Sequence, residues 1–147
     1  MPPGEIIQGF RNEDISSMTF ADNSIDLHIT QDVLEHVFHV DKAFSEISRT
    51  LKPGGMHICT VPLVSGVNPT KQRAEILPSG EINHLMEPDY HKNPISEDGS
   101  LVVWEWGYDI IERIYNASKM PTICLNINDL SKGIRAEYVD VLVSIKR

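Results

Sequence analysis

The sequence has few cysteines and no long apolar segment, and each absence excludes a class of protein. Its 147 residues include two cysteines, Cys59 and Cys124, and both lie in apolar stretches. This usage favours buried free thiols in a reducing compartment over a structural disulfide. No apolar stretch approaches the ~18 residues that cross a bilayer. The N-terminus lacks the charged start and apolar core of a signal peptide, so we expect a cytoplasmic protein that is not bound to a membrane.

Positive charge is also scarce. The chain has 13 Lys and Arg residues against 21 Asp and Glu residues, which gives a formal net charge of −8. Such a protein repels phosphate backbones, and no basic cluster reverses this locally, so a nucleic-acid partner is disfavoured. The hydrophobic content of 41% is ordinary for a globular protein, and a chain of this length forms one domain at most.

Apolar periodicity predicts a strand, a helix and a second strand in the first half of the chain. Residues 25–30 form a short β-rich run. Pro53-Gly54-Gly55 is expected to stop the helix and to turn the chain into an apolar strand at 56–61. Such a series is a βαβ unit with a parallel sheet. The residues that fall at helical spacing are Val40, Ala43, Phe44, Ile47 and Leu51.

The second half begins with a long irregular segment. From residue 62 to residue 100 no helical or strand period lasts, and loops of this length inside a compact domain are usually functional. We interpret 62–100 as a substrate-side insertion, and the alternative is a disordered loop. Two strands, 123–127 and 138–145, then close the chain as an antiparallel hairpin. Between them and the insertion we expect a helix that ends before Pro121, with an apolar face formed by Ile110, Ile111, Ile114 and Tyr115.

Four short segments follow one another between residues 13 and 55. They are Glu13-Asp14-Ile15, Phe20-Ala21-Asp22-Asn23-Ser24-Ile25-Asp26-Leu27, Asp32-Val33-Leu34-Glu35-His36-Val37 and Glu46-Ile47-Ser48-Arg49-Thr50-Leu51-Lys52-Pro53-Gly54-Gly55. In this order they resemble the second half of a class I S-adenosylmethionine-dependent methyltransferase of the small-molecule type 11 family. A series of matched segments is a far more specific signal than a lone glycine motif.

The resemblance implies an α/β fold with a partial Rossmann-like methyltransferase sheet. This chain would supply the family's strands 4, 5, 7 and 6 with their flanking helices, and a remnant of strand 3 at residues 5–10. In the family a Gly-x-Gly loop in the first βαβ unit holds the methionine and ribose of the cofactor. The sequence contains no such loop. We therefore expect residues 1–147 to form a single truncated methyltransferase domain.

The resemblance also implies a cofactor, S-adenosylmethionine, and residues that contact it. Asp14 would accept a hydrogen bond from the adenine amino group, for which a carboxylate is a strong acceptor, and the N–H of Ile15 would meet a ring nitrogen. The alternative for Asp14 is an aspartate that caps a turn or helix. Gln31 and Asp32 follow the first strand, and ligands gather at the carboxyl ends of strands in open α/β sheets. We expect both residues to border the cofactor.

His36 is the candidate catalytic residue. Its pKa suits removal of a proton from a hydroxyl or amine acceptor, whereas the alternative is a histidine that packs on the sheet and bonds to backbone. We interpret Glu35 as a solvated or structural charge, although the resemblance implies that this position lies close to the site. His36 and His39 have a spacing that chelates a metal on a helix, but no second group of ligands lies nearby in the sequence. We therefore expect no metal site.

Aromatic and histidine side chains of the insertion are the candidate acceptor site. We expect a pocket for a small-molecule acceptor to be lined by Tyr90, His91, Asn93 and Pro94 of the insertion, with Trp104 and Trp106. The alternative is that Trp104 and Trp106 cover the sheet as hydrophobic bulk.

Two functions follow from these features. The first is methyl transfer to a small molecule, driven by orientation and desolvation of the reactants, although we expect this chain alone to be inactive without the cofactor loop. The alternative is a non-catalytic binding or oligomerisation module that retains the truncated fold. The strand that should flank Ile25–Thr30 is absent, which leaves a free hydrogen-bonding edge. We therefore expect a homodimer or higher oligomer across this edge.

Overall fold

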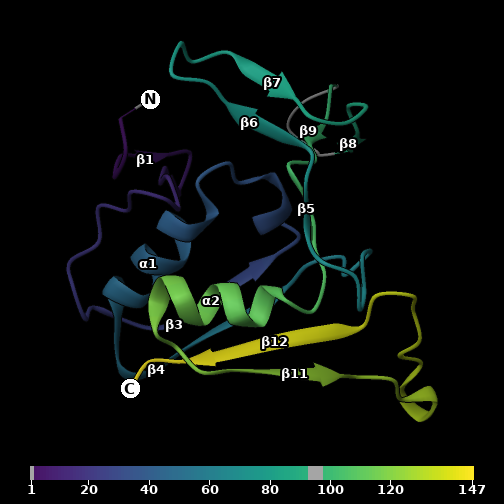
Figure 1. Ribbon diagram of the computed structural model, residues 1–147. Coiled ribbons are helices and arrows are strands. Elements are labelled where there is room, and N and C mark those ends of the chain that lie inside the picture. The colour runs from purple at the N-terminus through teal and green to yellow at the C-terminus, as the bar shows by residue number, and fades with distance from the viewer. Residues whose placement is uncertain (1, 93–97) are drawn as a thin grey trace.

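The computed structural model describes residues 2–92 and 98–147, and its centre is a four-stranded sheet (Figure 1). The order across the sheet is β11-β12-β4-β3. β3 and β4 are parallel, whereas β12 is antiparallel to both β4 and β11. The predicted parallel pair and the antiparallel closing hairpin are thus confirmed. The strands are β3 (Ile25–Gln31), β4 (Leu51–Thr60), β11 (Thr122–Asn126) and β12 (Asp140–Ile145).

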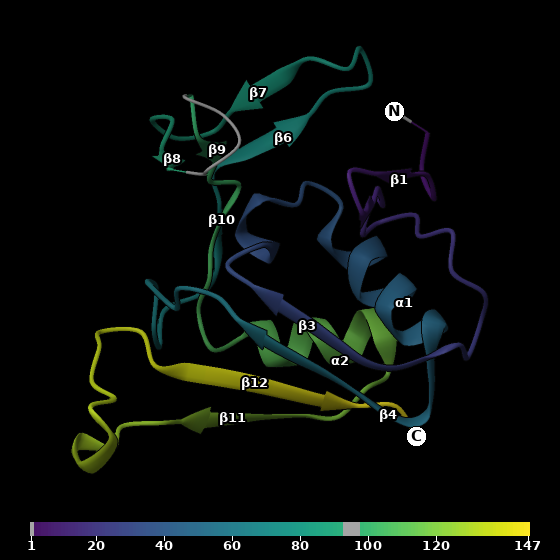
Figure 2. The same ribbon diagram turned by 180° about the vertical axis from the view of Figure 1, so that it is seen from behind.

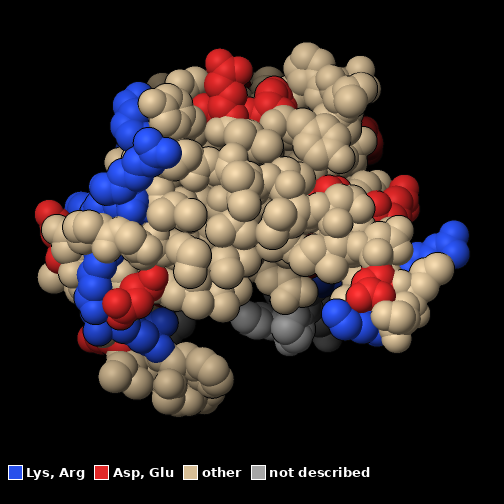
Figure 3. Space-filling view, turned by 90° about the horizontal axis from the view of Figure 1, so that it is seen from below, with Lys and Arg blue, Asp and Glu red and all other residues tan. Residues whose placement is uncertain are grey.

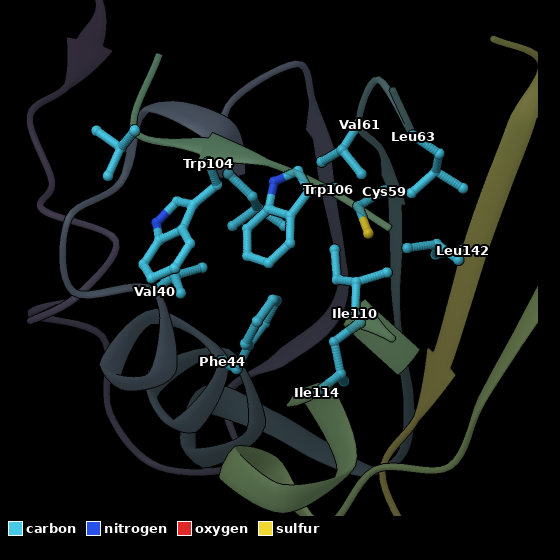
Figure 4. Packing of buried hydrophobic residues seen from close by; sticks show 12 residues of the cluster. Val40, Phe44, Cys59, Val61, Leu63, Trp104, Trp106, Ile110, Ile114 and Leu142 are labelled. Carbon is cyan, nitrogen blue, oxygen red and sulfur yellow. The ribbon is translucent and has the colours of Figure 1, made fainter. Parts of the chain in front are cut away.

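Two helices, α1 (Val40–Thr50) and α2 (Ile110–Ser118), cover one face of this sheet (Figures 1 and 2). Phe44 of α1 and Ile114 of α2 are completely buried, and Trp106 packs with them over the sheet (Figure 4). The apolar spacing of α1 therefore describes a true buried face. In α2 the prediction is wrong for Tyr115, which is 51% exposed because it lies on the far side of the helix from the sheet.

The segment Pro53-Gly54-Gly55 lies inside β4 rather than at the end of α1, which corrects the predicted boundary. The helix ends at Thr50, and Leu51 already has extended backbone angles. A residue that precedes proline also avoids helical angles, so Lys52 continues the extended chain. Gly54 has a φ of +80°, and a side chain on Gly55 would lie 2.8 Å from the carbonyl oxygen of Lys52. The segment forms an irregularity in the pairing with β3.

The other face of the sheet is apolar, and much of it is solvent-exposed. Ile123, Val143, Ile58 and Ile29 stand opposite one another across all four strands. Ile29, on the edge strand, is 68% exposed. A view from below shows a broad area without charged side chains (Figure 3). Exposed apolar areas of this kind mark interaction surfaces.

The N-terminal residues form a separate hairpin, so the predicted remnant of a sheet strand at residues 5–10 is wrong. β1 (Ile6–Ile7) pairs only with β2 (Phe10–Arg11). Gln8 and Gly9 between them both have positive φ angles, as a tight two-residue hairpin turn requires. The turn reverses the chain before a longer strand can form.

The segment 62–100 contains short two-stranded ladders, and residues 93–97 of it, with the candidate site residues Asn93 and Pro94, lie outside the described residues. β6 pairs with β7, β8 pairs with β9, and β5 pairs with β10 beyond the segment. The bounds of these strands are β5 (Lys71–Gln72), β6 (Ala74–Ile76), β7 (Ile82–His84), β8 (Tyr90–His91), β9 (Ser100–Leu101) and β10 (Trp104–Glu105).

Among the described residues, neither helix has the length and apolar character that a membrane span requires.

His57 is a polar residue in the buried layer between the sheet and the helices. It is completely buried, and its Nε2 lies 2.9 Å from the hydroxyl of Thr30. Burial and the neighbouring His28 lower the pKa of His57 to about 4. The folded state therefore holds His57 neutral, while the unfolded chain takes up a proton at its ordinary pKa.

We expect the free energy of unfolding to fall as the pH decreases from about 6.5 towards 4, because only the unfolded state is then protonated at His57. The stability is fully present above this range, and the loss is on the order of 3 kcal/mol. Urea denaturation at several pH values measures it. His57→Gln should flatten the pH dependence, whereas His84→Gln on the exposed β7 should preserve it. Equal slopes for the wild type and His57→Gln would contradict this assignment.

Candidate functional site

A pocket of about 840 Å³ opens at the carboxyl ends of the parallel strands β3 and β4. Parallel pairing brings Gln31 and Thr60 to the same edge of the sheet, where both strands end (Figure 2). This is where ligands bind in open α/β sheets. Five of the candidate residues line the pocket, together with Glu35: Gln31, Asp32, His36, Tyr90 and His91.

Asp32 connects the two strand ends. Its N–H donates to the carbonyl oxygen of Thr60 at 3.1 Å, and the Thr60 hydroxyl lies 3.5 Å from the carboxylate. The φ angle of Asp32 is +50°, in the left-handed region that residues other than glycine rarely adopt. The strand is thereby turned sharply into the short 3-10 helix η1 (Leu34–His36), and the Asp32 carboxylate remains in the pocket wall.

His36 is held in one orientation by the backbone. Its Nδ1 lies 2.8 Å from the carbonyl oxygen of Leu101, and because a carbonyl only accepts, Nδ1 carries the proton. In the neutral ring Nε2 then has a free lone pair. His36 thus bonds to backbone through one nitrogen, as the alternative stated, and its side chain also lines the pocket, while the role of general base remains a prediction. This arrangement suits a general base.

Glu35 is buried, so the interpretation of its side chain as a solvated charge is wrong. It is 1% exposed, and neither carboxylate oxygen has a hydrogen-bond partner among the described residues. Burial raises the pKa of this carboxyl group. Burial and then the charge of Glu35 raise the pKa of the Cys59 thiol to about 12. In the sequence, the one signal that Glu35 is buried was its apolar neighbours Val33, Leu34 and Val37.

Both tryptophans belong to the hydrophobic core, as the alternative interpretation stated, and they stack with ring centroids 5.4 Å apart (Figure 4). Trp104 also borders a second pocket of about 120 Å³, beside Glu35 and His91. Its indole N–H donates to the carbonyl oxygen of Val37 at 2.8 Å. Trp104 therefore packs in the core and fixes the segment that follows η1.

Asp14 and Ile15 line neither of these two pockets. The carboxylate of Asp14 accepts hydrogen bonds from the N–H and the hydroxyl of Ser16, which lower the pKa of Asp14. This is the turn-capping arrangement named above as the alternative. Ile15 packs partly buried against the core. The adenine contact of these two residues remains a prediction.

Both cysteines, Cys59 and Cys124, are free thiols. His39 precedes α1 and does not join His36 in a helix, because His36 is the last residue of η1. The helical chelating pair considered from the sequence therefore does not form.

We expect Trp104→Phe to accelerate hydrogen exchange at the amides of His36 and Val37, because it removes the hydrogen bond that holds the Val37 carbonyl. A lost bond of about 1 kcal/mol corresponds to roughly a fivefold change. Trp106→Phe is the matched control, since its indole N–H has no hydrogen-bond partner among the described residues. Equal local acceleration in both variants, after correction for global stability, would contradict the assigned role of Trp104.

Comparison with known sequences identifies part of the chain. Residues 3–59 match a family described as a methyltransferase domain. The chain is 29% identical over 121 residues to a dimethylglycine N-methyltransferase of Parasynechococcus marenigrum (strain WH8102), an alignment that covers 82% of this chain and 43% of the relative. The chain thus spans less than half the length of the curated relatives it matches.

Solved structures share the fold at low sequence identity. An S-adenosylmethionine-dependent methyltransferase from Mesorhizobium loti aligns with a TM-score of 0.57 and 16% identity, over 93% of this chain and 68% of the other. A 1,6-didemethyltoxoflavin-N1-methyltransferase from Burkholderia thailandensis, solved with its substrate and S-adenosylhomocysteine, aligns with a TM-score of 0.51 and 11% identity, over 90% and 48%. Residues 3–59 therefore match the methyltransferase-domain family, and the chain as a whole has the fold of S-adenosylmethionine-dependent methyltransferases.

Proposed function

We propose that this chain forms the acceptor-side part of an S-adenosylmethionine-dependent methyltransferase that acts on a small molecule. The observation that carries the proposal is the pocket where β3 and β4 end, with Gln31, Asp32 and His36 in its wall. In this proposal β3, β4, β12 and β11 correspond to the family's strands 4, 5, 7 and 6. The Gly-x-Gly loop, which residues 1–147 lack, is supplied by another segment or polypeptide.

The composition of the pocket wall fits the cofactor. Asp32, Glu35 and Glu137 contribute three carboxyl groups against the one ammonium group of Lys92, and such a wall favours the positive charge of a sulfonium over an anionic ligand. S-adenosylmethionine, when bound, supplies an electrophilic methyl group for in-line displacement. Gln31 and Asp32 would border it, and Asp14 with Ile15 would meet the adenine.

The chain's own chemical contribution is orientation and removal of a proton. Nε2 of His36, with its lone pair free, would take a proton from an acceptor hydroxyl or amine as the acceptor attacks. Tyr90, His91 and the indole of Trp104 would form the acceptor side and exclude water.

The free thiols of Cys59 and Cys124 are consistent with action in a reducing cytosol.

The uncovered apolar face of the sheet favours a second candidate function, a non-catalytic binding or oligomerisation module. We propose that a second copy of the chain covers this face and pairs along the free edge Ile25–Thr30. Such a homodimer, or a higher oligomer, would bury the apolar row that begins at Ile29. Both functions share this assembly, so cofactor binding is the property that separates them.

We expect S-adenosylhomocysteine to bind this chain with a dissociation constant on the order of 1 mM, because the chain supplies only part of the cofactor contacts. In a titration followed by amide NMR, the signals of Asp14, Ile15, Gln31 and Asp32 should shift. Asp14→Ala and Asp32→Ala should each weaken binding, whereas Asp26→Ala, at the other end of β3, should not. The absence of any shift at saturating ligand would favour the non-catalytic module.

We expect sedimentation equilibrium to show a dimer or higher oligomer at micromolar concentrations. Ile29→Lys should shift the chain to monomer, because it places a charge in the buried apolar row. Ile6→Lys alters an equally apolar residue that is 72% exposed on the N-terminal hairpin, and it should leave the assembly unchanged. A soluble wild-type monomer at high concentration would contradict subunit pairing.

A further inference from the structure

Glu35, His36 and His91 bring three metal-ligating atoms together in the wall of the pocket. One carboxylate oxygen and one ring nitrogen from each histidine all lie within 4.8 Å of one another. Glu35 and His36 are neighbours on η1, whereas His91 comes from β8, more than fifty residues later in the sequence. The fold thus assembles a set that no sequence spacing reveals.

Glu35 has the properties of a carboxylate that lacks its counter-charge. A buried carboxylate without partners is costly unless a cation or hydrogen-bond donors compensate it. Oε1 of Glu35 lies 3.8 Å from Nε2 of His36 and 3.8 Å from Nδ1 of His91. Both distances are too long for hydrogen bonds. The three groups are thus close together without direct hydrogen bonds between them, as ligands of one cation are.

The backbone orients both histidines towards that point. The bond from Nδ1–H of His36 to the carbonyl of Leu101 leaves Nε2 facing Glu35, and metal-ligating histidines commonly carry such an outer hydrogen bond. His91 stands opposite Ser100 in the β8–β9 ladder, so one hairpin places both imidazoles. Their rings meet edge to face, with centroids 5.1 Å apart.

The peptide chain also holds Glu35 in place. The N–H of Val103 donates to the carbonyl oxygen of Glu35 at 2.8 Å, so η1 is fixed to the segment that follows β9. The carboxylate therefore projects from a rigid, buried backbone rather than from a free loop. Such preorganisation distinguishes this group from a chance cluster of exposed acidic residues.

We propose that Glu35, His36 and His91 bind a divalent first-row transition-metal cation, with Zn²⁺ as the best match. Two imidazoles and one carboxylate are the donor set of many such centres. Tetrahedral ligands with bonds of about 2.1 Å lie about 3.4 Å apart. The two distances of 3.8 Å from the carboxylate to the histidines need only a small contraction, and the ligand nitrogens of the two histidines lie within 4.8 Å of each other. Remaining coordination positions would face the pocket.

Cation binding at this site is independent of methyl transfer. A consequence for catalysis does rest on the proposed function: a bound cation would coordinate an acceptor oxygen, lower the pKa of its hydroxyl and take over the task assigned to His36. The binding test below is therefore made without S-adenosylhomocysteine. A failure to bind metal would not change the result expected from the S-adenosylhomocysteine titration. A failure to bind S-adenosylhomocysteine would not change the result expected from the metal titration.

The test is a titration of the untagged chain, freed of metal by a chelator that is then removed, with Zn²⁺ in competition with a chromophoric indicator. We expect one equivalent to bind with a dissociation constant in the micromolar range or below. Co²⁺ in its place should give the intense visible absorption of a tetrahedral centre. Glu35→Gln and His91→Ala should each weaken binding at least tenfold, whereas His84→Ala on β7 should leave it unchanged.

Thermal denaturation separates a lost ligand from a lost fold. Glu35→Gln is nearly isosteric and removes a buried charge, so the metal-free variant should be at least as stable as the wild type. Zn²⁺ should raise the midpoint of the wild type and not that of Glu35→Gln. Absence of stoichiometric uptake by the wild type, or equal uptake by Glu35→Gln and His91→Ala, would overturn the proposal.

Discussion

The parallel pairing of β3 with β4 determines where the helix between them and the pocket lie. A parallel pair requires a crossover, and α1 supplies it on the face where Phe44 is buried. The same pairing brings Gln31 and Thr60 to one edge, so the chain leaves both strands beside a common pocket. Asp32, with its left-handed backbone, turns the first of these exits into η1. The site is thus a consequence of strand direction.

A second set of contacts gives that site its shape. Residues 101–104 fix η1 and the residue that follows it through three hydrogen bonds: His36 to Leu101, Val103 to Glu35 and Trp104 to Val37. The backbone groups at the pocket are therefore satisfied by a segment that is distant in sequence. This arrangement buries Glu35 and leaves its carboxylate without a hydrogen-bond partner among the described residues, so the side chain is a candidate for binding a ligand.

The sequence predicted the helices and strands that are determined by residues close together along the chain. The strand, helix and strand of the first half, and the closing hairpin, follow from local periodicity and are confirmed. Three errors have local causes: the helix ends before Pro53, Tyr115 lies outside the buried face, and a tight turn after Ile7 prevents a sheet strand. The burial of Glu35 had only its apolar sequence neighbours as a signal, because it also depends on a segment distant in sequence, which contacts Glu35 through Val103.

The proposed site requires that ligands bind where β3 and β4 end. The decisive measurement is a crystal structure of the chain grown with S-adenosylhomocysteine and Zn²⁺. We expect ligand density beside Gln31 and Asp32, and an anomalous signal between Glu35, His36 and His91. Well-defined ligand density on another part of the surface, with this pocket holding only solvent, would contradict it.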